Sequence, residues 1–345
     1  MLKITALLFL IVWIPLNATD ARKYDVLWFG DLHYDEAKYH DASKYKYTPH
    51  QLKNFRHYTK IWEQYSPPML KTAKEMFADK VPFVIHTGDW IQGDSSSETE
   101  KVAHMQKAIE VICAGIKVPF YPVRGNHDAR GAGGMPGYTR VIYPFINRQL
   151  KKEVNSLNYR MEYGKDLYLF IDSIDVDYGW LEKNLADHTK YRWTFVVAHY
   201  PLIPPPTTTR WKFGGKPENA KRLFELFLKH NVILLCGDDH KFELVQYKRG
   251  NQFFTQVMTN SVMPAKWKAS EFTGKDIAKR IFQKEPEKNF LLKDALSYQG
   301  WTGGGFAVLH VDEDQVSVDF YARKGWEQPK HKAVVRMKQT GAPEK

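Results

Sequence analysis

Five short stretches of the chain end an apolar run on Asp, Asn or His, the side chains that bind divalent metals and transfer protons. The clearest is Val118 to Arg130, where a strand-like run ends at Gly125 and is followed by Asn126, His127 and Asp128. Glycine permits a turn that most residues resist, so it would place this polar trio beyond the carboxyl end of the strand. The other four stretches end in similar motifs: Asp31-Leu32-His33, Gly88-Asp89, His199 and Gly237-Asp238-Asp239-His240.

The runs that precede these motifs are short and continuously apolar, which is typical of strands covered on both faces. A single His or Asp at a strand end is most often a cap or a satisfied hydrogen bond. Five such ends on one sheet would instead supply the oxygen and nitrogen ligands that divalent metals require. The sequence therefore predicts a metal centre at the carboxyl ends of several strands.

The ordered set of motifs resembles the calcineurin-like metallophosphoesterase family, whose pattern is Asp-x-His, Gly-Asp, Gly-Asn-His-Asp or Glu, a lone His and Gly-His-x-His. The motifs here run in the same order from Asp31 to His240. One position departs, because Asp238 stands where the family usually has His. The resemblance implies an α/β fold in which two mixed β-sheets pack as a sandwich flanked by helices.

The resemblance also implies two divalent metal ions, Mn, Zn or Fe, that share one ligand. The implied ligands are Asp31, His33, Asp89 and His240 for one ion and Asp89, Asn126, His199 and Asp238 for the other. His127 is expected to protonate the leaving oxygen or stabilise its charge, and Asp128 to orient that imidazole. The implied reaction is hydrolysis of a phosphate monoester by metal-bound hydroxide.

Two other classes of function remain open. A phosphodiesterase or nuclease would use the same metals, and segment 34–80 interleaves aromatic and basic residues that could stack on a nucleoside. Packing of these aromatic side chains onto the core is the more ordinary explanation. Asp238 also raises the alternative of a non-catalytic, metal-stabilised binding protein.

The Pro-rich, basic segment that follows His199 contains Arg210, the candidate contact for a substrate phosphate. An ordinary surface linker is an equal alternative for this segment. The net charge of the whole chain is +11, and a basic surface favours anionic partners by steering. Charge alone does not separate a phosphoester from nucleic acid or a membrane, and we favour a phosphoester substrate over nucleic acid.

The first 21 residues have the pattern of a secretory signal peptide, with Lys3, an apolar core from Ile4 to Leu16 and small residues after it. The apolar core is too short to span a bilayer comfortably. We therefore expect a secreted or periplasmic protein without a transmembrane segment in the mature chain. Residues 22–325 are expected to form the metallophosphoesterase domain, and residues 326–345 a basic C-terminal tail with little pattern.

The segments between the motifs predict the elements that position them. Helices are expected to begin at Pro67-Pro68, after a capping box at Ser97, and at Pro217. Hairpins or strand pairs are expected over 159–171, 243–257 and 306–321. Residues 131–137 are expected to form a flexible glycine-rich connection, and 266–296 a polar insertion. Two cysteines in 345 residues provide no disulfide framework.

Overall fold

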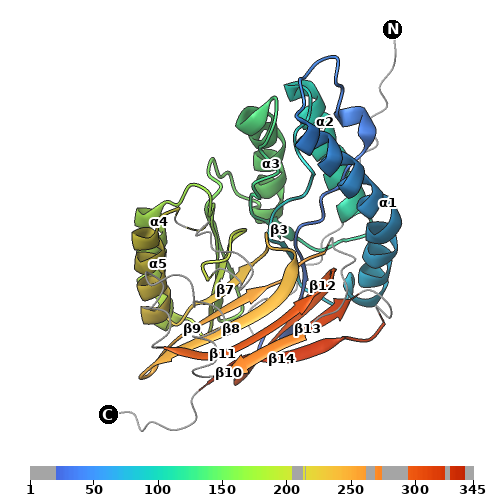
Figure 1. Ribbon diagram of the computed structural model, residues 1–345. Coiled ribbons are helices and arrows are strands. Elements are labelled where there is room, and N and C mark those ends of the chain that lie inside the picture. The colour runs from blue at the N-terminus through green and yellow to red at the C-terminus, as the bar shows by residue number, and fades with distance from the viewer. Residues whose placement is uncertain are drawn as a thin grey trace.

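The computed structural model describes residues 21–203, 213, 215–261, 269–273, 294–322 and 327–338. Two mixed β-sheets pack together, with helices on their outer sides (Figure 1). This arrangement confirms the predicted α/β sandwich. Within the described residues, no helix is both long enough and apolar enough to cross a bilayer.

The smaller sheet contains six strands, in the order β14 (His331–Met337), β13 (Gln315–Ala322), β12 (Gly305–Val311), β1 (Tyr24–Phe29), β2 (Val84–His86) and β3 (Phe120–Pro122). Strands β1, β2 and β3 are parallel neighbours. Their carboxyl ends therefore meet at one edge of the sheet.

The larger sheet contains eight strands, in the order β10 (Ala269–Thr273), β11 (Ala295–Thr302), β8 (Lys241–Arg249), β9 (Gln252–Met258), β7 (Ile233–Cys236), β6 (Thr194–Val197), β5 (Asp166–Phe170) and β4 (Tyr159–Tyr163). Strands β5, β6, β7 and β9 are successive parallel neighbours. The pairs β4–β5, β8–β9 and β12–β13 are antiparallel, as the sequence predicted.

Strand β5 shows why these strands are apolar on both faces. Tyr168 and Phe170 join the core between the two sheets. Leu167 and Leu169 point the other way and join a second core under α4 (Tyr178–Leu185) and α5 (Pro217–Lys229). Alternate side chains of a strand point to opposite faces, so a strand between two cores must be apolar throughout.

Three helices pack with the smaller sheet: α1 (Pro49–Phe77), α2 (Glu98–Cys113) and α3 (Gly134–Leu150). The start of α2 agrees with the prediction, because the Ser97 side chain accepts the Glu100 amide. Helix α1 corrects a prediction, because Pro67 and Pro68 lie inside it and not at its start. It begins instead after Thr48, whose side chain forms a capping box with Gln51.

A proline inside a helix removes a backbone hydrogen bond and is unfavourable in isolation. Helix α1 nevertheless continues through both prolines, and Met69 and Leu70 just beyond them are buried in the core. Tertiary packing of an apolar face supplies most helix stability in proteins. Burial therefore overrides the local signal that predicted a break.

Three other segments are more regular than predicted. Residues 331–337 were expected to belong to a tail with little pattern, but they form β14, which pairs with β13 and buries Ala333 and Val335. Helix α3 begins at Gly134 inside the expected flexible connection, and β10 lies inside the expected polar insertion. Strand β10 is stabilised by pairing with β11, and β14 by pairing with β13. The local sequence pattern does not reveal such partners.

Candidate metal centre

The five motifs follow the carboxyl ends of β1, β2, β3, β6 and β7. The two sheets thus bring together side chains that are separated by as many as 209 positions, from Asp31 to His240. Asp31, His33, Asp89 and His199 are buried.

The backbone of the motifs adopts an uncommon conformation. Positive φ angles occur at five predicted ligands, namely Asp31 (51°), His33 (44°), Asp89 (57°), Asp238 (77°) and His240 (51°). Residues other than glycine rarely adopt this region, and the strain persists only where the surrounding structure imposes it. The concentration of positive φ angles in these turns indicates a site that is built for a purpose other than stability.

Two motif glycines allow the turns to approach each other. A Cβ atom on Gly125 would lie 2.1 Å from both the amide nitrogen and Oδ1 of Asp89. A Cβ atom on Gly237 would lie 2.7 Å from Oδ2 of Asp31. Any larger residue at either position would push a predicted ligand out of place.

The first group of ligand atoms gathers around His33. Its Nε2 lies 3.1 Å from Nε2 of His240 and 3.5 Å from Oδ2 of Asp89. Nε2 of His240 is also 3.9 Å from Oδ1 of Asp31. These are the four residues predicted for one ion.

The second group gathers around His199. Its Nε2 lies 2.9 Å from Oδ1 of Asn126, 3.5 Å from Oδ2 of Asp89 and 3.6 Å from Oδ1 of Asp238. Oδ2 of Asp89 therefore belongs to both groups, as expected for a bridging ligand. The Asp238 carboxylate points into the site, although this position departs from the family pattern.

The chemistry of these groups fits two divalent ions. Two ligands that bind one tetrahedral ion at about 2.1 Å are about 3.4 Å apart, close to the separations found here. Oδ2 of Asp31 is buried without a hydrogen-bond partner among the described residues. Burial raises the pKa of Asp31 well above its usual range, and the charges of Asp89 and Asp238 raise it further. Bound cations would relieve this repulsion between carboxylates.

Backbone and amide oxygens fix the orientation of two histidines. Nδ1 of His33 donates to Oε1 of Gln92 at 3.0 Å, and Nδ1 of His199 donates to the carbonyl of Thr87 at 2.7 Å. In each ring, Nε2 is left to face the cluster. Such outer contacts hold a metal-binding imidazole in the required tautomer.

His127 lies beside the first group, and its ring centroid is 4.5 Å from that of His33. Nδ1 donates to the carbonyl of Gln92 at 2.7 Å, and Nε2 accepts from Nη1 of Arg130 at 3.1 Å. Burial lowers the pKa of His127, and the charge of Arg130 lowers it further. Because Nε2 accepts a hydrogen bond from Arg130, it carries no proton, and the imidazole is neutral in this arrangement.

Asp128 does not orient His127, which corrects the sequence prediction. Its carboxylate accepts the backbone amides of Gly125 at 2.7 Å, Trp90 at 2.8 Å and Asp89 at 3.1 Å. These bonds tie the turn after β2 to the turn after β3. Asp128 thus positions Asp89, while the Gln92 carbonyl orients the imidazole.

Three further residues at the site were not assigned a role from the sequence. Arg130 pairs with Asp94, with 2.6 Å between Nε and Oδ2, and contacts His127. Tyr58 of α1 stacks on His33 with ring centroids 4.6 Å apart, and its ring is 6.1 Å from those of His127 and His240. Gln92 contacts both His33 and His127 through different oxygens. The predicted phosphate contact Arg210 lies outside the described residues.

Arg130 and Gln92 had a sequence signal, because each lies within three residues of a motif aspartate. Tyr58 had only membership of the aromatic segment 34–80. Two other aromatic residues of that segment, Tyr39 and Trp62, are buried in the core, as the more ordinary explanation expected.

The model of the calcineurin-like phosphoesterase family matches residues 24–242, which is more than half of the chain. The chain belongs to this family. The match includes all of the predicted metal ligands, so the resemblance of the motifs is confirmed. No curated protein matches the sequence.

Solved structures with the same fold include phosphatases. A purple acid phosphatase from yellow lupin is 16% identical, with a TM-score of 0.53 over 87% of this chain and 51% of that chain. A dimetal phosphatase from Danio rerio is 11% identical, with a TM-score of 0.53 over 91% of this chain and 99% of that chain. The Plasmodium protein GAP50, described as the anchor in the inner membrane complex, is 13% identical, with a TM-score of 0.52 over 92% of this chain and 90% of that chain. These similarities concern the fold.

Replacing Asp238 with alanine is expected to remove one of two bound metal ions and most activity, because Asp238 completes the group around His199. Asp238→His should keep both sites and bind Zn²⁺ more tightly, since imidazole is a softer ligand than carboxylate. Metal titration with elemental analysis measures both effects. Asp239→Ala is the matched control and should retain two ions. Equal metal content in Asp238→Ala and the parent would show that Asp238 is not a ligand.

Proposed function

We propose that this chain is an exported, dinuclear-metal-dependent phosphoesterase that hydrolyses phosphate monoesters. The observation that carries the proposal is the position of Asp89, whose Oδ2 lies 3.5 Å from Nε2 of both His33 and His199. This atom joins two complete sets of ligand atoms. The family supports phosphoester hydrolysis in general, and the narrower choice of monoesters is our proposal.

When bound, two divalent ions supply positive charge that neutralises a phosphoester and lowers the pKa of a water nucleophile. The chain supplies the remaining functions. Asp128 fixes the turn that carries Asp89, and Gln92 fixes the planes of His33 and His127. A site with prearranged groups avoids reorganisation during the reaction.

His127 is the proposed proton donor to the leaving oxygen. In the structure its Nε2 accepts a hydrogen bond from Arg130, so this atom has no proton to give. An anionic phosphate nearby would favour the imidazolium form and attract the guanidinium of Arg130. We therefore propose that Arg130, whose side chain is 35% exposed, turns from His127 to the phosphate when substrate binds.

Replacing Arg130 with glutamine is expected to raise KM for para-nitrophenyl phosphate by about tenfold or more, since a hydrogen bond to a charged group contributes about 1.5–3 kcal/mol. Metal content should remain unchanged. Steady-state kinetics of metal-reconstituted protein measures the effect. Arg140→Gln is the control, because Arg140 is an exposed α3 residue paired with Glu98. An unchanged KM in Arg130→Gln would remove Arg130 from substrate binding.

The arrangement of aromatic residues favours a small substrate over nucleic acid. Tyr58 stands at the metal centre, whereas Tyr39 and Trp62 are buried and are not available as a wall for stacked bases.

The proposal of export depends on the apolar segment from Ile4 to Leu16, which lies outside the described residues. Detection of the mature chain outside the cell would support it.

The alternatives are a phosphodiesterase and a non-catalytic metal-stabilised protein. The fold alone does not decide, because it also occurs in a Plasmodium protein described as an anchor. The assay that separates them compares para-nitrophenyl phosphate with its bis ester on metal-reconstituted protein. Faster hydrolysis of the bis ester would favour a diesterase. Hydrolysis of neither substrate would favour a binding protein.

A further inference from the structure

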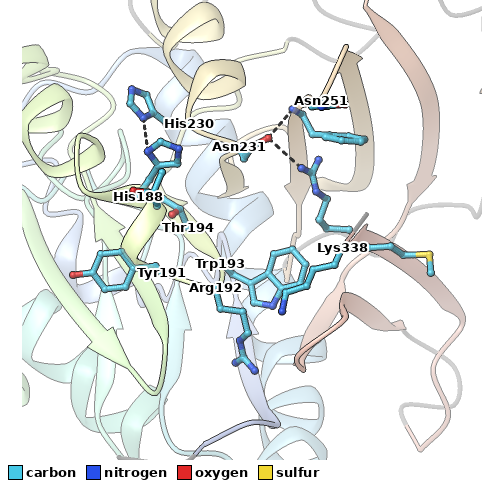
Figure 2. A pocket seen from close by; sticks show the side chains of 13 residues that line it. His188, Tyr191, Arg192, Trp193, Thr194, His230, Asn231, Asn251 and Lys338 are labelled. Atoms are coloured by element: carbon cyan, nitrogen blue, oxygen red, sulfur yellow. Dashed lines mark hydrogen bonds between the residues drawn. The ribbon is translucent and has the colours of Figure 1, made fainter. Parts of the chain in front are cut away.

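A cavity of about 380 Å³ lies at the other end of the strands that carry the metal ligands (Figure 2). It is lined by Thr194 at the start of β6 and Asn231 just before β7. The metal ligands His199 and Asp238 follow the ends of the same two strands. At about 3.3 Å per residue, the path along β6 from Thr194 to His199 is about 16 Å long. The cavity is therefore separate from the metal centre.

Arg336 of β14 is the central cation of this cavity. Its guanidinium carbon lies 3.6 Å from the centroid of the Phe253 ring, and Nη2 donates to Oδ1 of Asn231 at 3.3 Å. The same oxygen of Asn231 accepts the backbone amide of Phe253 on β9 at 3.0 Å. Both contacts of the guanidinium are with uncharged groups.

In the part of the chain that the structure describes, no carboxylate forms an ion pair with Arg336, and the cavity lining contains neither Asp nor Glu. Burial lowers the pKa of Arg336 to about 9. A half-buried cation without an anionic partner is unfavourable. An anion in the cavity would remove this cost.

The carboxyl end of α5 is the nearest alternative source of negative charge, because helix ends carry partial charges. His230, which caps α5, lines the cavity. The carbonyls of Phe227 and Leu228 nevertheless accept the amides of Val232 and Asn231 at 3.0 and 3.2 Å. These carbonyls are already occupied, so the helix compensates Arg336 only weakly.

The remaining walls also suit an anionic group. The lining contains two further cations: Lys338, which follows β14, and Arg192, whose guanidinium is paired with Asp166. Nδ1 of His188 and Nδ1 of His230 are hydrogen bonded to each other at 2.9 Å. Trp193 and Phe253 contribute aromatic surface. Arginine binds tetrahedral oxyanions well, because its planar fork donates several hydrogen bonds.

We propose that this cavity binds a phosphate or sulfate group, with Arg336 as the main contact and Lys338 as the second. The group can belong to a free oxyanion or to a small organic ester. This site is independent of the proposed hydrolysis, because its residues do not touch the metal ligands.

The test is calorimetric titration of inorganic phosphate into metal-reconstituted protein. The parent should show two classes of binding, one at the metal centre and one at the cavity. Arg336→Gln should remove one class or weaken it by about tenfold or more. Glutamine retains a donor for Asn231, and circular dichroism verifies that the fold is unchanged.

Arg222→Gln is the matched control. Arg222 also lies over an aromatic ring, 4.6 Å from the centroid of Tyr178, but it pairs with Glu182 at 2.6 Å. This variant removes the same charge outside the cavity and should retain both classes. Identical phosphate binding in the parent and Arg336→Gln would overturn the proposal.

A second probe, phenylphosphonate, separates the two sources of the oxyanion. If phenylphosphonate binds the Arg336-dependent site more tightly than phosphate does, the cavity is assigned to an organic ester. If phenylphosphonate binds equally or more weakly, the cavity is assigned to the free ion. Crystals soaked in tungstate should show an ion beside Arg336. Tungstate found only at the metal centre would contradict the proposed cavity site. A protein that binds phosphate at the cavity but hydrolyses no phosphate ester would contradict only the proposed function.

Discussion

Replacing Asp89 with alanine is expected to remove both metal ions and to reduce hydrolysis to below about 1% of the parent rate. Oδ2 of Asp89 faces both groups of ligand atoms, so its loss weakens two sites at once. Changes in the groups that merely support a metal ligand already cost about 10–100-fold in affinity or activity. Elemental analysis and a phosphatase assay measure the two effects.

The parent protein provides the companion experiment. Prolonged chelation should abolish its hydrolysis, and added Mn²⁺ or Zn²⁺ should restore it, whereas Asp89→Ala should not recover. Asp25→Ala is the control, because Asp25 pairs with His310 on β1 and β12, away from the motifs. Full activity in a preparation shown to be metal-free would overturn the metal-dependent mechanism.

Replacing His127 with alanine is expected to lower turnover by about 10²- to 10⁴-fold while metal content stays the same, since that is the usual contribution of a general acid. The loss should be smaller for para-nitrophenyl phosphate, whose leaving group needs little protonation, than for an alkyl phosphate. Rates for the two substrates, measured with metal content, test both statements. His57→Ala, an exposed residue of α1, is the control.

A fall in bound metal would contradict this role for His127. The structure makes that outcome testable, because ligand atoms of His33, Asp89 and His127 lie within 4.8 Å of one another. Rescue of turnover by a better leaving group, without any change in metal content, is the result that distinguishes a proton donor from a ligand.

The sequence by itself determined the candidate ligand residues and the strand ends that carry them. Asp31, Asp89 and His199 each follow a short apolar strand, and both faces of those strands are covered, as the continuous apolar runs required. The strand periodicity and the glycine turns are local properties, so they can be recognised without the fold. The antiparallel pairs β4–β5, β8–β9 and β12–β13 were predicted for the same reason.

The tertiary structure decided which groups orient these side chains. Asp128 was expected to contact its neighbour His127, but it accepts the amides of Asp89 and Trp90 from another turn. The parallel pairing of β2 with β3 places these two turns side by side. Nδ1 of His127 instead donates to the carbonyl of Gln92 at 2.7 Å.

Tertiary packing also decided the elements that surround the site. Helix α1 continues through Pro67 and Pro68 because its apolar face is buried, and this continuity brings Tyr58 onto His33. Strand β14 forms because β13 offers it an edge, and it carries Arg336 to the cavity at the far end of the larger sheet. The local sequence indicates where turns occur and which faces of a strand are apolar. Burial and strand pairing depend on contacts with residues that are distant in the sequence.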